Sequence, residues 1–308
     1  MSDPYPTPHS SGNQSPGSQS PVAFSIVIPC YNEVGAIEDT LREIESSVFW
    51  PDPYEVIVVN DGSRDGSTEV LERLAEELPK LRVLHHARNR GYGAALKSGI
   101  AVAYAPIIVI TDADGTYPNH RIPEFVEGCA NFEMVIGSRT ADDVEYSKIR
   151  SIPKFFLKRW VSWLAGQPVP DMNSGLRAFR RSTIEHFIGI MPDGFSFTTT
   201  STLAFLTNFR PVQFLPIGYK TRIGKSKIKP IRDTLRFSML ILRTGMYFAP
   251  LRLLSPVIAL FALLSLGSLA YDVFWVANLS DKTTLLFMLT FNTALFALLA
   301  DMIDKRTR

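Results

Sequence analysis

Two aspartates separated by one residue, Asp112 and Asp114, directly follow the apolar run Ile107–Ile110. Two carboxylates that project from the end of a buried strand are suited to hold one hard divalent cation together with phosphate oxygens. Oxygen ligands of this kind favour Mg²⁺ or Mn²⁺. The alternative is an Asx turn completed by Gly115, but it leaves Asp112 unexplained. The spacing therefore predicts a metal-binding pair for a phosphorylated substrate.

Polar clusters follow three further apolar runs, at residues 29–33, 60–63 and 88–93. Acidic clusters on one rim repel one another unless cations, a metal or a bound donor offset them. Taken alone, Asp61 is better explained as a turn former before Gly62 and Ser63. The pair Gly91-x-Gly93 lacks the third glycine of a dinucleotide fingerprint, because Leu96 stands in its place, so a nicotinamide enzyme is disfavoured. These glycines admit a nucleotide or allow close helix packing, and the sequence favours neither alternative.

The elements that must position these clusters alternate between strand and helix. The spacing predicts strands at residues 24–29, 54–59, 81–84, 107–111 and 134–137, and helices at 34–44, 68–78 and 94–103. Repeats of this type build a Rossmann-like α/β fold, with a mostly parallel sheet and helices on both faces. Ligands of such sheets bind at the carboxyl ends of the strands, which is where the polar clusters fall.

Composition restricts the class of partner. The 308 residues include 32 basic and 30 acidic side chains, a net charge of +2 that provides no field for holding nucleic acid, so no nucleic-acid partner is expected. The two cysteines, Cys30 and Cys129, form no disulfide framework, which fits a cytosolic compartment. Residues 1–22 are rich in Ser and Pro and predict a disordered tail.

Two long apolar stretches near the C-terminal end predict transmembrane helices over residues 253–277 and 283–303. Arg243 and Arg252 precede the first, and a tail over residues 304–308 with three basic side chains follows the second, whereas the loop between them has no net charge. This asymmetry predicts a two-span integral membrane protein with both ends and the catalytic domain on the cytoplasmic side.

Two basic segments of the chain also indicate contact with the membrane surface. The chain from Lys220 to Arg243 carries eight basic residues against one acid, Asp233, together with an apolar helical stripe, so residues 221–252 predict a basic amphipathic juxtamembrane segment. Residues 148–164 combine Trp160 and Trp163 with lysines and arginines. They predict an interfacial helix, with a core helix as the alternative.

Six motifs occur in order along the chain: FSIVIPCYNE at 24–33, VVNDGS at 58–63, NRGYGAALKSG at 89–99, DADGTYP at 112–118, IGSRT at 136–140 and NSGLRAFRR at 173–181. Together they resemble family 2 inverting glycosyltransferases, and most closely the polyprenyl-phosphate sugar synthases, which include dolichyl-phosphate mannose synthase and undecaprenyl-phosphate glycosyltransferases. The resemblance covers about residues 23–229. It implies a GT-A catalytic domain over residues 23–220.

The resemblance also implies roles for individual residues. The pocket for a UDP- or GDP-linked nucleotide sugar would be lined by Pro29, Tyr31, Glu33, Asp61, Asn89 and Gly91. Asp112 and Asp114 would hold Mg²⁺ or Mn²⁺ on the diphosphate. Arg139 and Arg177 match arginines that meet phosphates, and Arg177 with Arg222, Lys225 and Lys227 would contact the acceptor phosphate. Thr116 and Tyr117 stand where many members have a glutamine, which leaves a third metal ligand unassigned.

The class of acceptor is inferred from the absence of an acidic residue at a position where many relatives have one. A sugar hydroxyl acceptor needs a general base, which many relatives supply as a carboxylate near the position of Thr198, Thr199 and Thr200. A phosphate monoester, with a second pKa of ~6, is largely dianionic at neutral pH and needs no strong base. We therefore expect transfer to a polyprenyl phosphate. Asp171 is the remaining candidate for a base or an acceptor-orienting group, with a structural cap as the equal alternative.

Two other functions are kept as hypotheses. A processive family 2 polysaccharide synthase usually carries a Gln-x-x-Arg-Trp motif, but here Phe156 precedes Arg159 and Trp160 in place of the glutamine. A non-catalytic, membrane-anchored nucleotide-sugar sensor would not require Asp112 and Asp114. A homo-oligomer is compatible with the sequence.

Overall fold

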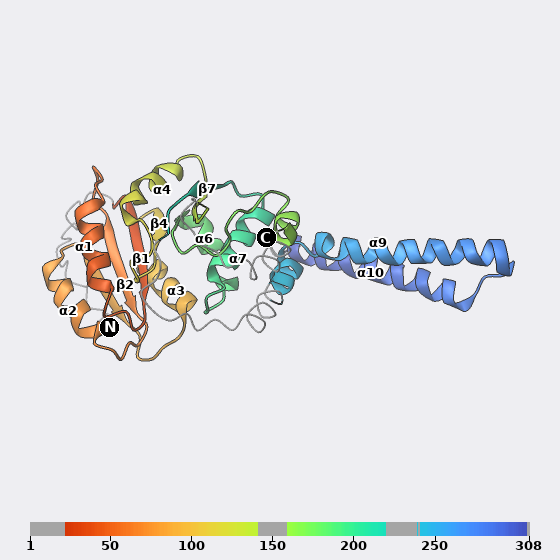
Figure 1. The fold of residues 1–308 in the computed structure, drawn as a ribbon, viewed down its shortest axis with the longest axis horizontal. Coiled ribbons are helices and arrows are strands. Elements are labelled where there is room, and N and C mark those ends of the chain that lie inside the picture. Colours follow the sequence, from red (N-terminus) through yellow and green to blue (C-terminus); the bar gives the residue numbers. More distant parts are fainter. Residues whose placement is uncertain (1–21, 141–158, 220–238, 240, 307–308) are drawn as a thin grey trace, which may run out of the picture.

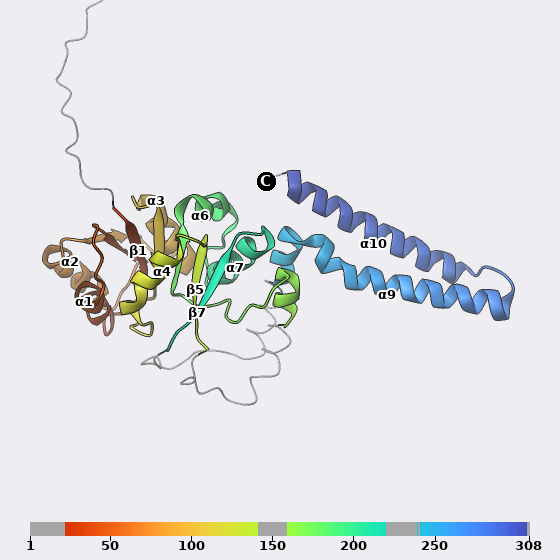
Figure 2. The same ribbon diagram turned by 90° about the horizontal axis from the view of Figure 1, so that it is seen from above.

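The computed structural model describes residues 22–140, 159–219, 239 and 241–306. An α/β domain at one end of the molecule continues into two long helices that run back along each other and extend away from it (Figures 1 and 2). Residues 1–21, 141–158, 220–238, 240 and 307–308 lie outside the described residues. They include nearly all of the predicted tail and parts of the predicted interfacial helix and juxtamembrane segment.

A seven-stranded sheet with the order β3-β2-β1-β4-β6-β5-β7 forms the centre of the described domain. Its strands are β1 (Phe24–Cys30), β2 (Glu55–Asn60), β3 (Leu81–His85), β4 (Ile107–Ile110), β5 (Met134–Ser138), β6 (Arg177–Arg180) and β7 (Val212–Pro216). Only β6 runs antiparallel to its neighbours, β4 and β5. The predicted mostly parallel α/β sheet is confirmed, and the five predicted strands correspond to β1 to β5.

Helices cover both faces of the sheet. One face carries α1 (Ile37–Ser47), α2 (Ser67–Glu77) and α4 (Ile122–Gly128), and the other carries α3 (Tyr92–Val102), α6 (Arg181–Phe187) and α7 (Phe197–Thr207). Short 3₁₀ turns at Asn119–Arg121 and Ile188–Ile190 adjoin α4 and α6.

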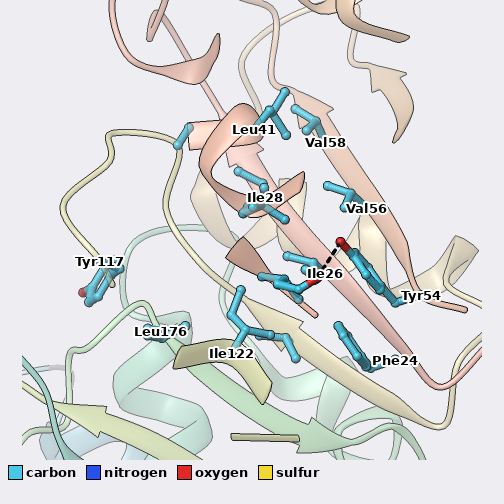
Figure 3. Close-up of a cluster of buried hydrophobic side chains, with 14 of the residues drawn as sticks. Phe24, Ile26, Ile28, Leu41, Tyr54, Val56, Val58, Tyr117, Ile122 and Leu176 are labelled. Atoms are coloured by element: carbon cyan, nitrogen blue, oxygen red, sulfur yellow. Dashed lines mark hydrogen bonds between the residues drawn. The ribbon is translucent and has the colours of Figure 1, made fainter. Parts of the chain in front are cut away.

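Strand β1 shows why the sheet is buried on both sides. Its Ile26 and Ile28 pack into the cluster beneath α1 and α2, while Val27 packs into the cluster beneath α3. Figure 3 shows the first of these clusters, where side chains of β1 and β2 meet Leu41 of α1. Successive strand residues point to opposite faces, so a continuous apolar run is what a sheet covered on both sides requires.

The C-terminal hairpin consists of α9 (Pro250–Tyr271), a π turn (Asp272–Val276) and α10 (Asp281–Arg306). The apolar parts span 27 residues at Pro250–Val276 and 23 residues at Asp281–Ile303, long enough to cross a bilayer core of ~30 Å. Hydroxyl pairs join the helices, from Ser265 to Thr290 at 3.1 Å and from Ser268 to Thr283 at 2.6 Å. Most other side chains are apolar and exposed, which distinguishes the hairpin from a pair of soluble core helices.

The base of the hairpin packs onto the α/β domain. Helical residues 159–165 and 241–248 lie between them. One buried cluster joins Leu164 and Ile241 of these segments with Leu206 of α7 and Leu253 of α9. The Arg252 guanidinium also donates a 3.2 Å hydrogen bond to the carbonyl oxygen of Leu164. These contacts tie the helices of the α/β domain to the apolar hairpin.

Candidate active site

The aspartate pair lies at the carboxyl end of β4, where both side chains are partly exposed. The Tyr92 hydroxyl, from the first turn of α3, donates a 2.9 Å hydrogen bond to Oδ1 of Asp112. On the other side Asp112 meets Gly175, where a Cβ atom would lie 2.7 to 2.9 Å from the carboxylate. A larger residue there would have to displace the Asp112 carboxylate, so the loop before β6 closes directly on it.

Asp114 forms the Asx turn considered in the sequence. Its Oδ1 accepts hydrogen bonds from the Thr116 amide at 3.2 Å and the Thr116 hydroxyl at 2.6 Å, and Gly115 has φ +68°. Thr116, at the place of the family's glutamine, therefore orients Asp114. The turn is compatible with a metal site because it fixes the carboxylate at the strand end.

The donor set of this turn suits a hard cation. Asp112 and Asp114 offer carboxylate oxygens, and no cluster of three or more Asp, Glu, His or Cys side chains able to hold a metal occurs within the described ranges. A cation held by two carboxylates would complete its shell with phosphate oxygens and water, as Mg²⁺ usually does in nucleotide sites. The residues present thus fit a divalent metal on a diphosphate.

Arg139 follows β5 and lies in an ordered ion pair with Asp171. The guanidinium donates from Nε to Oδ2 at 2.7 Å and from Nη2 to Oδ1 at 3.0 Å, and the Arg139 amide also donates to Oδ2. The guanidinium carbon lies 5.3 Å from the ring centre of Tyr219. Tyr219 in turn makes an edge contact with Tyr117, whose hydroxyl oxygen accepts a 2.7 Å hydrogen bond from the Gly175 amide. Arg139 is therefore held in a fixed direction near the aspartate turn.

The ion pair sets the charge of both partners. Burial is the largest single influence and would raise the pKa of Asp171, but the hydrogen bonds and charge of Arg139, together with the Asn173 amide, hold that pKa below its ordinary value. Burial likewise opposes the charge of Arg139, and the hydrogen bond to Asp171 raises the pKa of Arg139 above its usual range. Asp171 is thus ionised and engaged, a state that suits orientation of an arginine better than proton abstraction.

Arg177 has a different environment, with none of its surface exposed. It donates to the carbonyl oxygens of Ser174 and Thr198 at 2.5 and 2.9 Å, and further to the carbonyl of Met172 and the hydroxyls of Ser201 and Thr202. Burial lowers its pKa to about 10, so it remains protonated at neutral pH. In this arrangement Arg177 joins the loop before β6 to the first turn of α7, and its predicted contact with a phosphate stays a prediction.

Asp61 is 2% exposed at the end of β2. Its Oδ1 accepts a hydrogen bond from the Arg90 amide at 2.9 Å and lies 2.6 Å from Nδ1 of His86, and its Oδ2 accepts from the Gly91 amide at 2.8 Å. Asp61 therefore anchors the loop that leads into α3. Its predicted contact with a nucleoside remains a prediction.

The other predicted donor residues surround this loop. Pro29 and Cys30 pair in register with Val59 and Asn60, which brings the ends of β1 and β2 together. Tyr31 and Asn89 are exposed there, and Glu33 is partly exposed. The neighbouring strand ends thus gather the predicted nucleoside-binding residues on one side of β4, whereas Arg222, Lys225 and Lys227 lie outside the described residues.

Gly91 and Gly93 serve close packing of the chain. A Cβ atom at Gly91 would lie 2.5 Å from the carbonyl oxygen of Asp193, and one at Gly93 would collide with the carbonyl oxygen of Pro192. The Ala94 amide donates a 3.1 Å hydrogen bond to the same Asp193 oxygen. The glycines therefore let the segment before α7 dock on the start of α3, a contact between distant parts of the chain.

Fold and site together define a GT-A-type transferase, a class that acts on nucleotide-linked substrates at the carboxyl edge of its sheet. The chain belongs to Glycosyl transferase family 2, whose family model matches residues 25–188 of its 308 residues. This result confirms the resemblance and the fold class predicted from the motifs.

Two relatives and one solved structure extend this assignment. Glycosyltransferase AglD of Haloferax volcanii is 30% identical over 232 residues, which cover 72% of this chain and 37% of that protein. The undecaprenyl-phosphate 4-deoxy-4-formamido-L-arabinose transferase of Pseudomonas fluorescens is 32% identical over 259 residues, 80% of this chain and 70% of that protein. This chain thus spans little more than a third of the first relative and about two thirds of the second.

The solved structure is glucosyl-3-phosphoglycerate synthase from Mycobacterium tuberculosis in complex with Mn²⁺, UDP and phosphoglyceric acid. It superposes with a TM-score of 0.56 at 17% identity and covers 73% of this chain and 78% of that one. At this identity the likeness establishes the fold.

Several residues of the site were not predicted. Tyr92 and Gly175 hold Asp112, Tyr219 lies beside Arg139, and His86 lies beside Asp61. Tyr92 and Gly175 stand within the motifs at 89–99 and 173–181, but nothing in the sequence indicated these contacts.

Proposed function

We propose that this chain transfers a sugar, with inversion, from a UDP- or GDP-linked donor to the phosphate of a polyprenyl phosphate at the cytoplasmic face of a membrane crossed by α9 and α10. The observation that carries the proposal is the carboxylate pair at the end of β4, held by Tyr92, Gly175 and Thr116. Membership of Glycosyl transferase family 2 supports it.

The residues of the site divide the work. Asp112 and Asp114 would hold Mg²⁺ or Mn²⁺, which when bound offsets the charge that develops on the departing diphosphate. Arg139, aimed by Asp171, adds a second positive charge from the protein on the β5 side of the same edge. Because the carboxylates and the guanidinium are oriented before substrate arrives, little reorganisation is needed during the reaction.

Within the described ranges, the positions considered for a base offer no free carboxylate. The first turn of α7 presents Thr198, Thr199 and Thr200, and Asp171 is engaged with Arg139. A phosphate monoester acceptor supplies its own nucleophilic oxygen as a dianion above pH ~6. The arrangement therefore suits a phosphate acceptor better than a sugar hydroxyl, whose proton would have to be removed.

The membrane hairpin supports a lipid acceptor. Both helices are long and apolar enough to cross a bilayer, and their base packs on α7, whose first turn carries Thr198, Thr199 and Thr200. The second relative is named as a transferase for undecaprenyl phosphate. The basic residues Arg222, Lys225 and Lys227 are proposed to meet the acceptor phosphate near the anionic lipid surface.

The experiment is lipid-linked transfer by the full chain in vesicles that contain polyprenyl phosphate. Labelled UDP- and GDP-sugars are supplied one at a time with Mn²⁺ or Mg²⁺, and lipid extraction is followed by mild acid release. We expect one donor to label the lipid, EDTA to abolish labelling, and Asp114→Asn to lower the rate on the order of a hundredfold or more. Asp52→Asn, at an exposed position away from the site, is the control and should transfer normally.

Three outcomes would contradict the proposal. Full metal-dependent activity of Asp114→Asn would remove the carboxylate pair from the reaction. A product with more than one added sugar would indicate a processive synthase. Tight donor binding without transfer to any lipid would indicate a sensor.

A further inference from the structure

An aromatic ring stands unusually exposed beside the aspartate turn. Phe195 is 85% exposed, yet its ring stacks on Tyr92 with 5.4 Å between ring centres and 20° between planes. Tyr92 is the residue whose hydroxyl donates to Asp112. Phe195 is therefore separated from a predicted metal ligand by a single side chain.

The segment that carries Phe195 is fixed to α3. Its Asp193 carbonyl accepts the hydrogen bond from Ala94, and the Asp193 carboxylate forms a 2.7 Å ion pair with Lys97. The absent side chains of Gly91 and Gly93 create the space for this contact. An apolar ring held in water by a docked segment loses hydrophobic stabilisation that a bound apolar surface would restore.

The sheet order indicates which part of a donor would reach this ring. The predicted nucleoside-binding residues follow β1 and β2 on one side of β4, while β6, β5 and Arg139 lie on the other side. A diphosphate held at the end of β4 with its nucleoside over β1 and β2 directs its sugar away from those strands. Phe195 precedes α7, whose Phe205 packs against Phe179 of β6. The segment of Phe195 therefore reaches Tyr92 from the β6 side of β4, which is the side toward which the sugar would be directed.

We infer that Phe195 binds the sugar of the nucleotide-sugar donor by stacking against an apolar C–H face of the sugar ring, and that it contributes to the choice of sugar. Tyr92 supports the ring from behind and links it to Asp112. The inference rests on the proposed function, because it requires a diphosphate at the aspartate pair. It adds a specificity residue outside every motif of the sequence.

The test separates the sugar from the nucleotide. With the full chain in detergent micelles and MnCl₂ present, calorimetry gives the Kd for UDP, for GDP and for the sugar-bearing donor identified by the transfer panel. We expect Phe195→Ala to leave the nucleoside diphosphate Kd unchanged and to weaken donor binding about tenfold, the size of a lost stacking contact. Phe195→Tyr retains a ring and should restore donor affinity.

Kinetics and controls complete the design. In Phe195→Ala the ratio of kcat/KM between the best and second-best donor sugar should fall, whereas KM for the lipid phosphate should not change. Phe49→Ala is the matched control, since Phe49 is 78% exposed between α1 and the start of β2, at the edge of the sheet opposite to the aspartate turn. Tyr92→Phe retains the stacking ring but removes the hydroxyl on Asp112, and it should weaken Mn²⁺-dependent UDP or GDP binding without lowering sugar discrimination.

Each contrary result has a distinct meaning. An equal loss of nucleoside diphosphate and donor binding in Phe195→Ala would overturn the inference, because the ring would then act only through Tyr92 on Asp112. A rise confined to the KM for the lipid would overturn it in favour of an isoprenoid contact. A wild-type chain that binds neither UDP nor GDP with Mn²⁺ would instead contradict the proposed function.

Discussion

Arg139 and Arg177 each follow a short stretch with Gly and Ser, and the family resemblance implies that both contact phosphates. Their exposure and their hydrogen-bond partners nevertheless differ. Arg139 retains 23% of its side-chain exposure and pairs with a carboxylate, Asp171. Arg177 is fully buried and donates only to carbonyl and hydroxyl oxygens within the described part of the chain. One arginine faces the rim of the sheet, and the other lies beneath it.

The difference originates in the strands that carry them. Arg139 follows the last residue of β5 and so lies past the edge of the sheet. Arg177 pairs with Ile110 of β4 and Ile136 of β5, between two apolar strands. A buried guanidinium is retained when its donors are satisfied, and Arg177 uses them to join the loop at Ser174 to α7. A shared motif therefore does not imply a shared role.

The largest expected effect is a loss of stability when Arg177, the buried arginine, is replaced. Arg177→Met removes the charge but retains most of the stem, and it leaves the Ser174 and Thr198 carbonyls without their donor. Several buried acceptors without partners predict a loss of on the order of 3–5 kcal/mol in the free energy of unfolding. Thermal unfolding in detergent, followed by intrinsic fluorescence, should show a melting temperature lower by roughly 10 °C.

Unchanged stability of Arg177→Met would contradict a structural role for Arg177. If Arg177→Met melts like the wild type but loses affinity for the lipid phosphate, Arg177 contacts the acceptor as the resemblance implies. Arg180→Met, at the exposed end of the same strand, is the control for a general effect of substitution on β6.

The next largest effect is a loss of rate when Arg139, the partly exposed arginine, is replaced. Arg139→Gln retains hydrogen-bonding groups but removes the positive charge, and we expect kcat to fall about 10² to 10³-fold, as for loss of one oriented group that stabilises developing charge. Folding should change less than in Arg177→Met, because Arg139 is partly exposed. Arg73→Gln, in a surface ion pair with Glu38 and Glu77, is the control and should retain full transfer.

Asp171→Asn distinguishes an orienting group from a base. Loss of the charged hydrogen bonds to Arg139 should lower kcat about tenfold to a hundredfold, the value of one charge-assisted hydrogen bond. A catalytic base would cost more, on the order of 10³ or above, and its loss would remove a limb of the pH profile. A loss of that size would assign proton abstraction to Asp171.

The pH dependence of the transfer rate can be predicted from the direction in which the pKa of Asp171 is shifted. The pKa of Asp171 is lowered, so its ion pair stabilises the fold above the unfolded value of ~3.9 and is lost as the pH falls through the lowered value. Asp171 therefore does not titrate between pH 5 and 8. Rates with a phosphate acceptor should rise through pH ~6 in the wild type and equally in Asp171→Asn, because the titrating group is the substrate. An inflection that disappears in the variant would contradict this assignment.

Much of the sheet could be predicted because β1, β2 and β4 are continuous β-branched runs buried on both faces. Strand β6 gave no such signal, since its four residues begin and end with arginine. Helix α7 is buried on all sides and rich in threonine, so it has no polar face and no helical periodicity. Their positions depend on tertiary packing that local spacing does not encode.

The same limit applies to the site. Asp112, Asp114 and Arg139 stand at strand ends and could be found from spacing and motif. Tyr92 and Phe195 are 103 positions apart and meet only because the segment before α7 docks on α3. Whether an arginine lies on the rim or beneath it likewise depends on the register of β6 between β4 and β5.

The smallest effect tests how Arg139 is aimed. The Tyr219 ring lies 5.3 Å from the guanidinium carbon, and Tyr219→Leu removes this ring while leaving the ion pair with Asp171. A partly exposed cation–π contact contributes about 0.5–1 kcal/mol, so kcat should fall roughly two- to fivefold, and Tyr219→Phe should retain most of the rate. Because Tyr219 aims Arg139, the loss should vanish when Tyr219→Leu is combined with Arg139→Gln in a double-mutant cycle. Additive losses would mean that Tyr219 contacts the substrate itself, and the direction of Arg139 would then be set by Asp171 alone.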